Sequence, residues 1–172
     1  MVDRMLIDTL NFKAKDFGAR WKAMIRRSPH LKHYQTMSDE ELVADNERLY
    51  PVLARSLERG IDRSHVGDFF VKLGKTRMEK GFPVSELVFA LSLSHQTVIE
   101  YLMSDFVLDS TVRMYQAMGV MTKVAEFFHL SAFYVTKGFL EETYTHMSKH
   151  HEISEEILKK YFRDDFFFKK SD

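Results

Sequence analysis

The chain has 172 residues, 45% of them apolar, and its 25 lysines and arginines balance 25 aspartates and glutamates. This length is typical of one domain with a core of its own. A formal charge of zero argues against a general nucleic-acid binder, because such binding requires many neutralised phosphates. The absence of cysteine excludes disulfides and thiolate chemistry within these residues.

The first segment is expected to be a helix over 3–28. Apolar residues recur there at steps of three and four, which places them on one helical face. This set is Leu6, Leu10, Ala14, Phe17, Trp21 and Met24. Ser28-Pro29 ends the helix, because the residue before a proline is pushed out of helical geometry. The charged residues Asp3, Arg4 and Asp8 do not suit a signal peptide, and no segment is apolar enough to span a membrane, so we expect a cytoplasmic location.

The second helical segment begins in "MSDEEL", where Ser38 can cap the helix and Glu41 can complete a capping box. Its apolar stripe consists of Leu42, Leu49, Leu53 and Leu57, and Gly60 is a natural stop. Pro51 lies inside this pattern and removes a helical hydrogen bond. The sequence therefore predicts either a kink at Pro51 or two shorter helices.

Opposite charges are concentrated in these first two segments. Residues 11–33 are rich in lysine and arginine, whereas 39–47 are rich in aspartate and glutamate. Charge runs usually belong to solvated faces or pair with neighbouring charges. We therefore expect the two runs to face each other across two helices.

The third segment begins near Asp62 and places Val66, Phe69, Phe70 and Leu73 on one face. Gly81 is suited to the left-handed conformation that closes a helix, and Pro83 suits the start of the next one. "KGFPVSEL" is therefore predicted to be a turn between two helices, with an anion site at the second helix as the alternative. The fourth helix is expected over about 84–106.

The fifth segment has the most regular pattern. Its residues alternate steps of four and three, which predicts a heptad seam for a bundle or a dimer. The seam consists of Met114, Met118, Met121, Ala125, Phe128, Ala132, Val135 and Phe139, and Ala117, Val120, Val124, Phe127 and Tyr134 widen it. Such an apolar helix must be covered by its own bundle or by a second copy. Gly119 and Gly138 weaken the helix and can allow close packing.

Two side chains are candidates for lining a signal pocket. Arg77 continues an apolar stripe beyond Leu73, where a cation needs a buried partner, an anionic ligand or a route to solvent along its own stem. His95 lies between Leu91 and Val98 on the stripe of the fourth segment. Its imidazole can bind haem, sense protons or make a core hydrogen bond. We expect Arg77 and His95 to line any ligand pocket, with purely structural roles as the alternative.

Two histidine patterns are candidates for metal sites. Glu126-x-x-His129 is half of a di-iron motif, but the chain has no second Glu-x-x-His. Glu142, His146 and His150 follow at four-residue steps and could share one helical face. The remaining ligands of such a set are missing, so we predict neither a metal nor another cofactor. No nucleophile elbow, kinase loop set or dinucleotide fingerprint is present, and the sequence predicts no catalytic residue.

The order of several landmarks resembles one known family. Trp21 is followed by Ser28-Pro29, Tyr34 and "MSDEEL", then by "LGKTRMEKGFPVSELVFALSLSHQTVIEYL" at 73–102 and "VAEFFHLSAFYVTKGF" at 124–139. This order resembles the N-terminal input domain of bacterial RsbT co-antagonist proteins of the RsbR/RsbRD type, which is also found ahead of histidine kinases. The resemblance covers about 20–140. Its most specific part consists of Leu73-Gly74, Arg77, Gly81, Pro83 and Glu86-Leu87.

The resemblance implies a non-enzymatic signal-input or regulatory domain that acts through protein contact, as in stress-response and two-component signalling. We expect one all-α domain over 1–172, an antiparallel bundle of about five helices with globin-like packing as one option, and a helical extension at 141–172. The expected partners are a kinase or an anti-sigma-antagonist protein, in cis or in trans, and a second copy of the chain. Neither nucleic acid nor a membrane is expected. The alternative is a helical bundle that binds a small ligand, haem or a metal.

Overall fold

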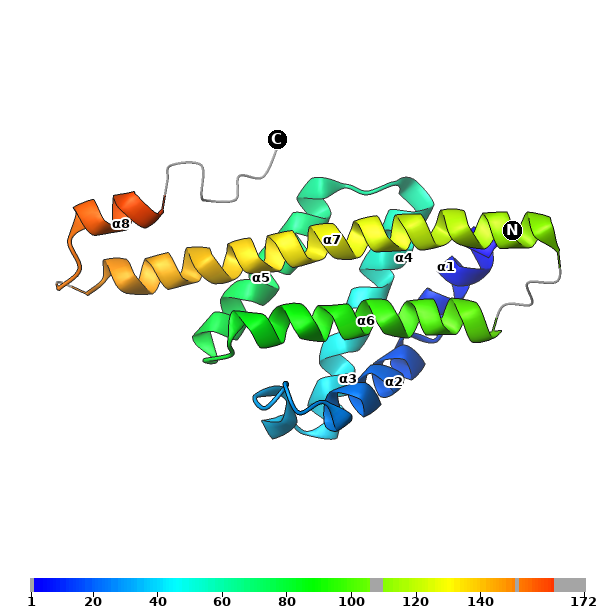
Figure 1. Cartoon of the computed structure of the whole chain (residues 1–172), viewed down its shortest axis with the longest axis horizontal. Coiled ribbons are helices and arrows are strands. Elements are labelled where there is room, and N and C mark those ends of the chain that lie inside the picture. The colour runs from blue at the N-terminus through cyan, green and yellow to red at the C-terminus, as the bar shows by residue number, and fades with distance from the viewer. Residues whose placement is uncertain (1, 106–109, 151, 163–172) are drawn as a thin grey trace. The chain divides into compact units, whose positions relative to one another are not determined.

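The computed structural model describes residues 2–105, 110–150 and 152–162. Within these residues all regular elements are helical, eight α-helices and one 3-10 helix, which confirms the all-α prediction (Figure 1). The chain divides into two compact units. The first unit comprises 1–62 and 89–129, and the second comprises 63–88 and 130–172. The Phe166–Phe168 cluster at the end of the sequence lies outside the described residues.

The first predicted helix is in fact two helices, α1 (Val2–Phe12) and α2 (Ala14–Arg27). They are separated at Lys13, whose φ of −118° and ψ of 24° lie outside helical geometry. The predicted stripe nevertheless continues across the break, because its main members are buried: Leu6, Leu10, Phe17 and Trp21. Ser28 adopts an extended conformation with ψ of 122°, as expected before Pro29.

The second segment also forms two helices, after a short 3-10 helix (Tyr34–Thr36). The predicted capping box opens α3 (Asp39–Glu47): the Glu41 N–H donates to Ser38 Oγ at 3.1 Å, and the Ser38 N–H donates to Glu41 Oε2 at 2.9 Å. α3 and α4 (Leu49–Arg59) meet at Arg48. Pro51 therefore lies in the first turn of α4, where its missing N–H would have no intrahelical partner.

The first unit is built from α1 to α4, most of α6 (Val84–Asp105) and the first half of α7 (Thr111–Ser148). α1 packs against α4, and α2 packs against α3. The Trp21 indole Nε1–H donates to the carbonyl oxygen of Ala90 at 2.9 Å, which ties α2 to α6. The core of this unit is aliphatic and aromatic and includes Ile25, Leu31, Tyr34, Leu42, Leu53, Val98 and Leu102.

The second unit contains α5 (Arg63–Glu79), the first turn of α6, the second half of α7 and α8 (Glu155–Tyr161). Gly81 has a φ of 77°, so the predicted left-handed turn between α5 and α6 is confirmed. Ser154 caps α8 by accepting a hydrogen bond from the Ile157 N–H at 3.3 Å.

The most buried row of α7 is displaced by one residue from the centre of the predicted seam. Positions that alternate steps of three and four are all buried: Ala117, Val120, Val124, Phe127, Ser131, Tyr134, Gly138 and Glu141. Of the predicted seam, Phe128 and Val135 are also buried, whereas Met121, Ala125, Ala132 and Phe139 are partly exposed. Met114 and Met118 are exposed. The beginning of the seam therefore has no cover among the described residues of its own chain.

Candidate functional site

The turn after α5 explains how the second unit accommodates a buried cation. The Gly81 N–H donates to the carbonyl oxygen of Met78 at 2.9 Å, and the Phe82 N–H donates to that of Arg77 at 3.0 Å. These two bonds form a Schellman motif. The motif returns the Phe82 ring to the end of α5, where it lies 4.9 Å from the guanidinium carbon of Arg77. "RMEKGFP" is therefore a local device that covers the cation with an aromatic ring.

Arg77 has the largest fully buried side chain among the described residues, with only 2% of its surface exposed. It follows Phe70 and Gly74 on the buried face of α5, so it does not reach solvent along its stem. Two buried acids belong to the same unit, Glu86 on α6 and Glu141 on α7. Burying a charge is costly unless the charge is paired, so the stability of the second unit depends on how these groups are paired.

One of these acids has a defined partner at the edge of a cleft. Glu141 Oε2 lies 2.9 Å from Lys75 Nζ, and the glutamate side chain is almost fully buried whereas the lysine remains partly exposed. The cleft lies between α5 and α7 within the second unit and has a volume of about 560 Å³; its lining consists of His65, Asp68, Phe69, Val71, Lys72, Lys75 and Glu141. Its charges are mixed and balanced, so it favours neither anions nor cations.

Two glycines allow α5 and α7 to touch backbone to backbone. A Cβ atom on Gly74 would overlap the carbonyl oxygen of Val135 and would lie 2.8 Å from the Phe139 nitrogen. A Cβ atom on Gly138 would overlap the carbonyl oxygen of Val71. The predicted close packing at Gly138 is therefore confirmed, with Gly74 as its counterpart. A crossing this tight cannot deform smoothly, so any movement of α5 on α7 requires a discrete change of packing.

His95 belongs to the first unit and lies on α6. Its ring is 5.1 Å from the ring of Phe128 on α7, at an interplanar angle of 31°. The side chain is partly buried, and its Nε2 is buried with no hydrogen-bond partner among the described residues. Burial lowers the pKa of His95 below its ordinary value, and the nearby His129 lowers it further. The neutral imidazole is thus the form that the folded chain favours.

The two predicted pocket residues belong to different compact units, Arg77 to the second and His95 to the first. Neither residue lines the cleft between α5 and α7 described above. Arg77 contacts the ring of Phe82 and His95 contacts the ring of Phe128, and a ligand-binding role for the two residues stays a prediction.

A buried polar cluster in the first unit was not predicted. Asn46 Nδ2 donates to Ser94 Oγ at 2.8 Å, and the Tyr50 hydroxyl donates to Asn46 Oδ1 at 2.6 Å. Ser94 in turn donates to the carbonyl oxygen of Ala90 at 3.3 Å, the same oxygen that accepts from Trp21. Burial raises the pKa of the Tyr50 hydroxyl far above its ordinary value, so it remains a donor. The cluster links α2, α3, α4 and α6, and the Ala90 carbonyl oxygen accepts hydrogen bonds from both α2 and α6.

The sequence contained a signal for this cluster. Asn46 occupies a step of the heptad-like series Leu42, Asn46, Leu49, Leu53, and Ser94 interrupts the series Leu87, Leu91, Ser94, Val98 in the same way. A polar residue in each of two apolar stripes indicates a possible buried hydrogen bond, because buried polar groups are nearly always paired.

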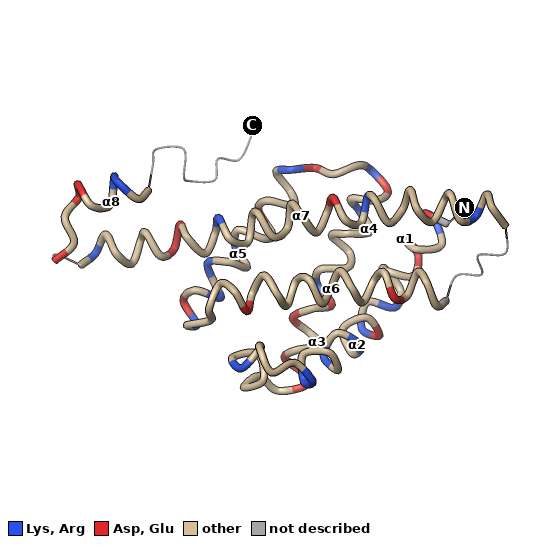
Figure 2. The backbone as a smooth tube through the Cα atoms, in the orientation of Figure 1, with Lys and Arg blue, Asp and Glu red and all other residues tan. Residues whose placement is uncertain are grey.

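The predicted meeting of basic and acidic runs is confirmed between α2 and α3 (Figure 2). Asp39 accepts from Lys22 Nζ at 2.9 Å and from Arg26 at 2.7 and 3.1 Å. The Lys22 ammonium and then the Arg26 guanidinium lower the pKa of the Asp39 carboxyl. Arg26 also donates to the carbonyl oxygens of Gln35 and Met37 at 2.9 and 2.7 Å, so it holds the 3-10 helix and its exit as well.

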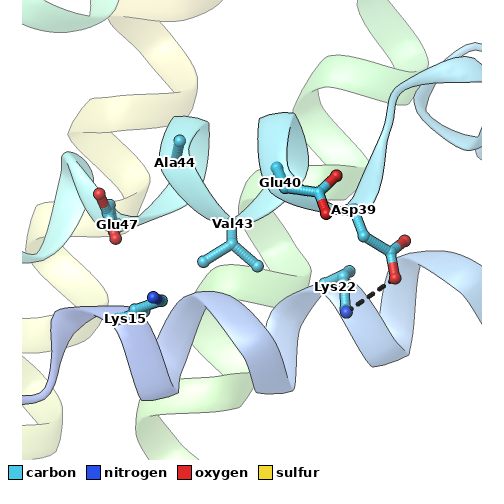
Figure 3. A pocket seen from close by; sticks show the side chains of 7 residues that line it. All are labelled: Lys15, Lys22, Asp39, Glu40, Val43, Ala44 and Glu47. Atoms are coloured by element: carbon cyan, nitrogen blue, oxygen red, sulfur yellow. Dashed lines mark hydrogen bonds and ion pairs between the residues drawn. The ribbon is translucent and has the colours of Figure 1, made fainter.

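A shallow groove of about 390 Å³ follows this charged boundary (Figure 3). Val43 projects toward α2 between Lys15 and Lys22, and Glu47 lies at the Lys15 end. The groove contains both signs of charge and is widely open to solvent. It shows no concentration of one charge that would select a ligand.

The two histidine patterns considered for metals do not form ligand clusters. Glu142 Oε1 and His146 Nε2 are 3.4 Å apart on α7, but α7 ends at Ser148, so His150 does not continue their helical face. Across the described ranges, no group of three or more histidine, aspartate or glutamate side chains is arranged to hold a metal ion. No helix in those ranges combines the length and apolarity that a membrane span requires.

The described residues thus form an all-α chain with buried charges and a close crossing of α5 and α7. The family model for the RsbT co-antagonist protein rsbRD N-terminal domain matches residues 15–152. The chain therefore belongs to this family, whose members are regulatory signal-input domains. Comparisons with curated proteins and with solved structures gave no match.

Proposed function

We propose that the chain is a non-enzymatic input domain that regulates a signalling protein by direct contact. The family membership over 15–152 is the observation that carries this proposal. The partner is a kinase or an anti-sigma-antagonist protein, in cis or in trans, and the chain acts in the cytoplasm as a homodimer. We also propose that the two compact units act as one domain, because α6 and α7 each contain residues of both.

The proposed mechanism is a change of helix packing on α7. Its second half meets α5 through Gly138 and Gly74, where backbones touch and intermediate positions are sterically blocked. A helix held in this way can switch between discrete packings, which is what a signal requires. The buried Arg77, close to the end of the same α5, gives any such change a large electrostatic consequence.

Arg77 and His95 are the residues we propose for sensing. His95 supports this role through its partly buried imidazole and lowered pKa, which make its protonation state responsive to its surroundings. Arg77 supports this role because it is a buried cation, and an anionic ligand would bind it if α5 and its neighbours moved apart.

Direct binding tests the proposal. The purified chain is titrated with a purified kinase or anti-sigma-antagonist protein encoded in the same genome, by calorimetry or biolayer interferometry. Saturable binding that changes the partner's activity supports the regulatory function. Absence of binding across all candidates, or turnover of a substrate by the chain itself, would overturn it.

The alternative from the sequence, a ligand, haem or metal binder, has its own test. Protein purified without chelator is examined by absorption spectroscopy and elemental analysis. A Soret band, or stoichiometric metal that is lost on His146→Ala, would replace the contact mechanism with a binding function.

A further inference from the structure

The first three turns of α7 expose an uncharged face. Val112, Tyr115 and Met118 have 66%, 71% and 61% of their surface exposed, although all three are apolar or aromatic. Residues 111–122 contain a single charged residue, Arg113, and it is partly buried. Depletion of charge together with tyrosine and methionine distinguishes the centre of a protein interface from ordinary surface.

Gly119 lies on this same face, one turn after Tyr115. It is inside a long helix with no positive φ, so no backbone conformation requires a glycine there. An added Cβ atom would meet nothing within 4 Å among the described residues. A glycine at such a place weakens the helix by about 1 kcal/mol relative to alanine.

The same helix shows what a glycine does when a neighbour is present. At Gly138 an added Cβ atom would overlap the backbone of α5. Gly138 is buried and lies at a helix crossing within the chain, whereas Gly119 is exposed and no described helix lies against it. The contrast indicates that Gly119 serves a crossing with a helix from outside the chain.

We propose that this face, defined by Val112, Tyr115, Met118 and Gly119, is the contact between two copies of the chain, with the two α7 helices crossing at Gly119. The inference rests on the proposed homodimer and assigns it a surface. A second copy is the occupant that the chemistry favours. Val112, Tyr115, Met118 and Gly119 carry no charge, and Lys123 one turn further on is paired with Asp3 of its own chain at 2.9 Å. The face can therefore meet its own image without like-charge repulsion, whereas a charged partner would leave its charges unpaired.

The two-fold symmetry of the proposed dimer explains a glycine at position 119. In a two-fold dimer the residue next to the axis meets its own copy, and a glycine there allows the two backbones to approach closely. The side chains one turn before it then pack against the partner. Thr122, one turn after Met118, has its hydroxyl bonded to the Met118 carbonyl oxygen at 3.0 Å, so it needs no further hydrogen-bond acceptor in an apolar contact.

Sedimentation of the full chain tests the surface with three variants. Gly119→Leu places a large side chain at the crossing, and Met118→Glu adds a charge to the apolar face. Phe12→Glu is the matched control, because Phe12 is 87% exposed on α1 and outside the proposed surface. We expect a dimeric wild type, a dissociation constant raised about tenfold or more in the first two variants, and no change in the control. Circular dichroism confirms that each variant is folded.

The variant Gly119→Ala distinguishes a glycine at a dimer interface from a glycine on a free surface. The methyl group should raise the unfolding midpoint of the diluted monomer and, at the same time, weaken the dimer. A structural glycine without a partner would give only the first effect, which would overturn the surface. A dimer that persists in Gly119→Leu and Met118→Glu would also overturn the proposed contact surface, but not the proposed homodimer. A monomeric wild type would overturn both the surface and the homodimer. Binding of the signalling partner is measured separately, so the proposed regulatory function is judged on its own result.

Discussion

Gly138 on α7 lies directly against the backbone carbonyl of Val71 on α5, so close that no Cβ atom fits between them. Gly138→Ala must therefore push the two helices apart or distort one of them. Overpacking of this kind typically costs about 1–3 kcal/mol of unfolding free energy. Urea unfolding followed by circular dichroism measures the loss as a lower midpoint with an unchanged slope.

Gly119→Ala, in the same helix, is the control for Gly138→Ala. At a concentration where the chain is monomeric, the methyl group enters open space and should stabilise the helix by up to about 1 kcal/mol. The two substitutions are chemically identical and should act in opposite directions. Equal effects would show that α5 and α7 do not meet at Gly138 as described.

A second prediction concerns the buried cluster around Asn46. Asn46→Ala removes the acceptor of the Tyr50 hydroxyl and the donor to Ser94 in one step. A buried polar group left without a partner costs about 1–3 kcal/mol, so unfolding free energy should fall by at least that amount. Thermal unfolding measures it.

The double variant Asn46→Ala/Tyr50→Phe controls for the unpaired hydroxyl. It should recover part of the loss, because the stranded polar group is gone. A double variant that loses the sum of both single effects would mean that Asn46 and Tyr50 contribute independently.

Local devices in this chain were predictable because nearby residues determine them. The capping box at Ser38 and the left-handed turn at Gly81 each depend on a few consecutive residues, and both were found as expected. The break at Lys13 was not predictable in this way. The apolar stripe continues through it without a change of period, and lysine carries no signal that ends a helix.

The buried row of α7 required knowledge of its neighbours. Apolar residues occupy two adjacent rows, so periodicity alone cannot decide which one faces the core. The row with the deepest burial contains Ser131, Gly138 and Glu141, which a count of apolar residues ranks low. Two of them lie against α5: Gly138 meets Val71, and Glu141 meets Lys75. Such partners are distant in sequence and cannot be inferred from α7 itself.

A third prediction separates the two cations that bind Asp39. Lys22 contributes one exposed ion pair, whereas Arg26 binds the carboxylate and two backbone carbonyls. We expect Arg26→Ala to lower the unfolding midpoint more than Lys22→Ala. Added salt should reduce the Lys22 effect, because an exposed pair is screened. It should leave most of the Arg26 effect, since hydrogen bonds to carbonyls persist.

Arg26→Lys is the matched variant for the guanidinium. Lysine keeps the charge but cannot reproduce the planar set of donors that reaches Asp39, Gln35 and Met37 together. It should therefore resemble Arg26→Ala more than wild type. Full rescue by lysine would show that charge alone matters at this position.

The last prediction follows from the pKa of His95. Burial first, and then the nearby His129, lower this pKa in the folded chain below its ordinary value of 6.5. The unfolded chain therefore binds the proton more readily than the folded chain, and protonation favours unfolding. The contribution of His95 is fully retained above the unfolded pKa near 6.5 and is lost progressively as the pH falls below it.

Urea unfolding at about pH 7.5 and about pH 5.5 brackets this range. His95→Gln should reduce the difference in unfolding free energy between the two pH values, and His129→Gln should reduce it by a smaller amount, because it removes only the second cause. A difference that is the same in wild type and in His95→Gln would rule out His95 as the titrating group.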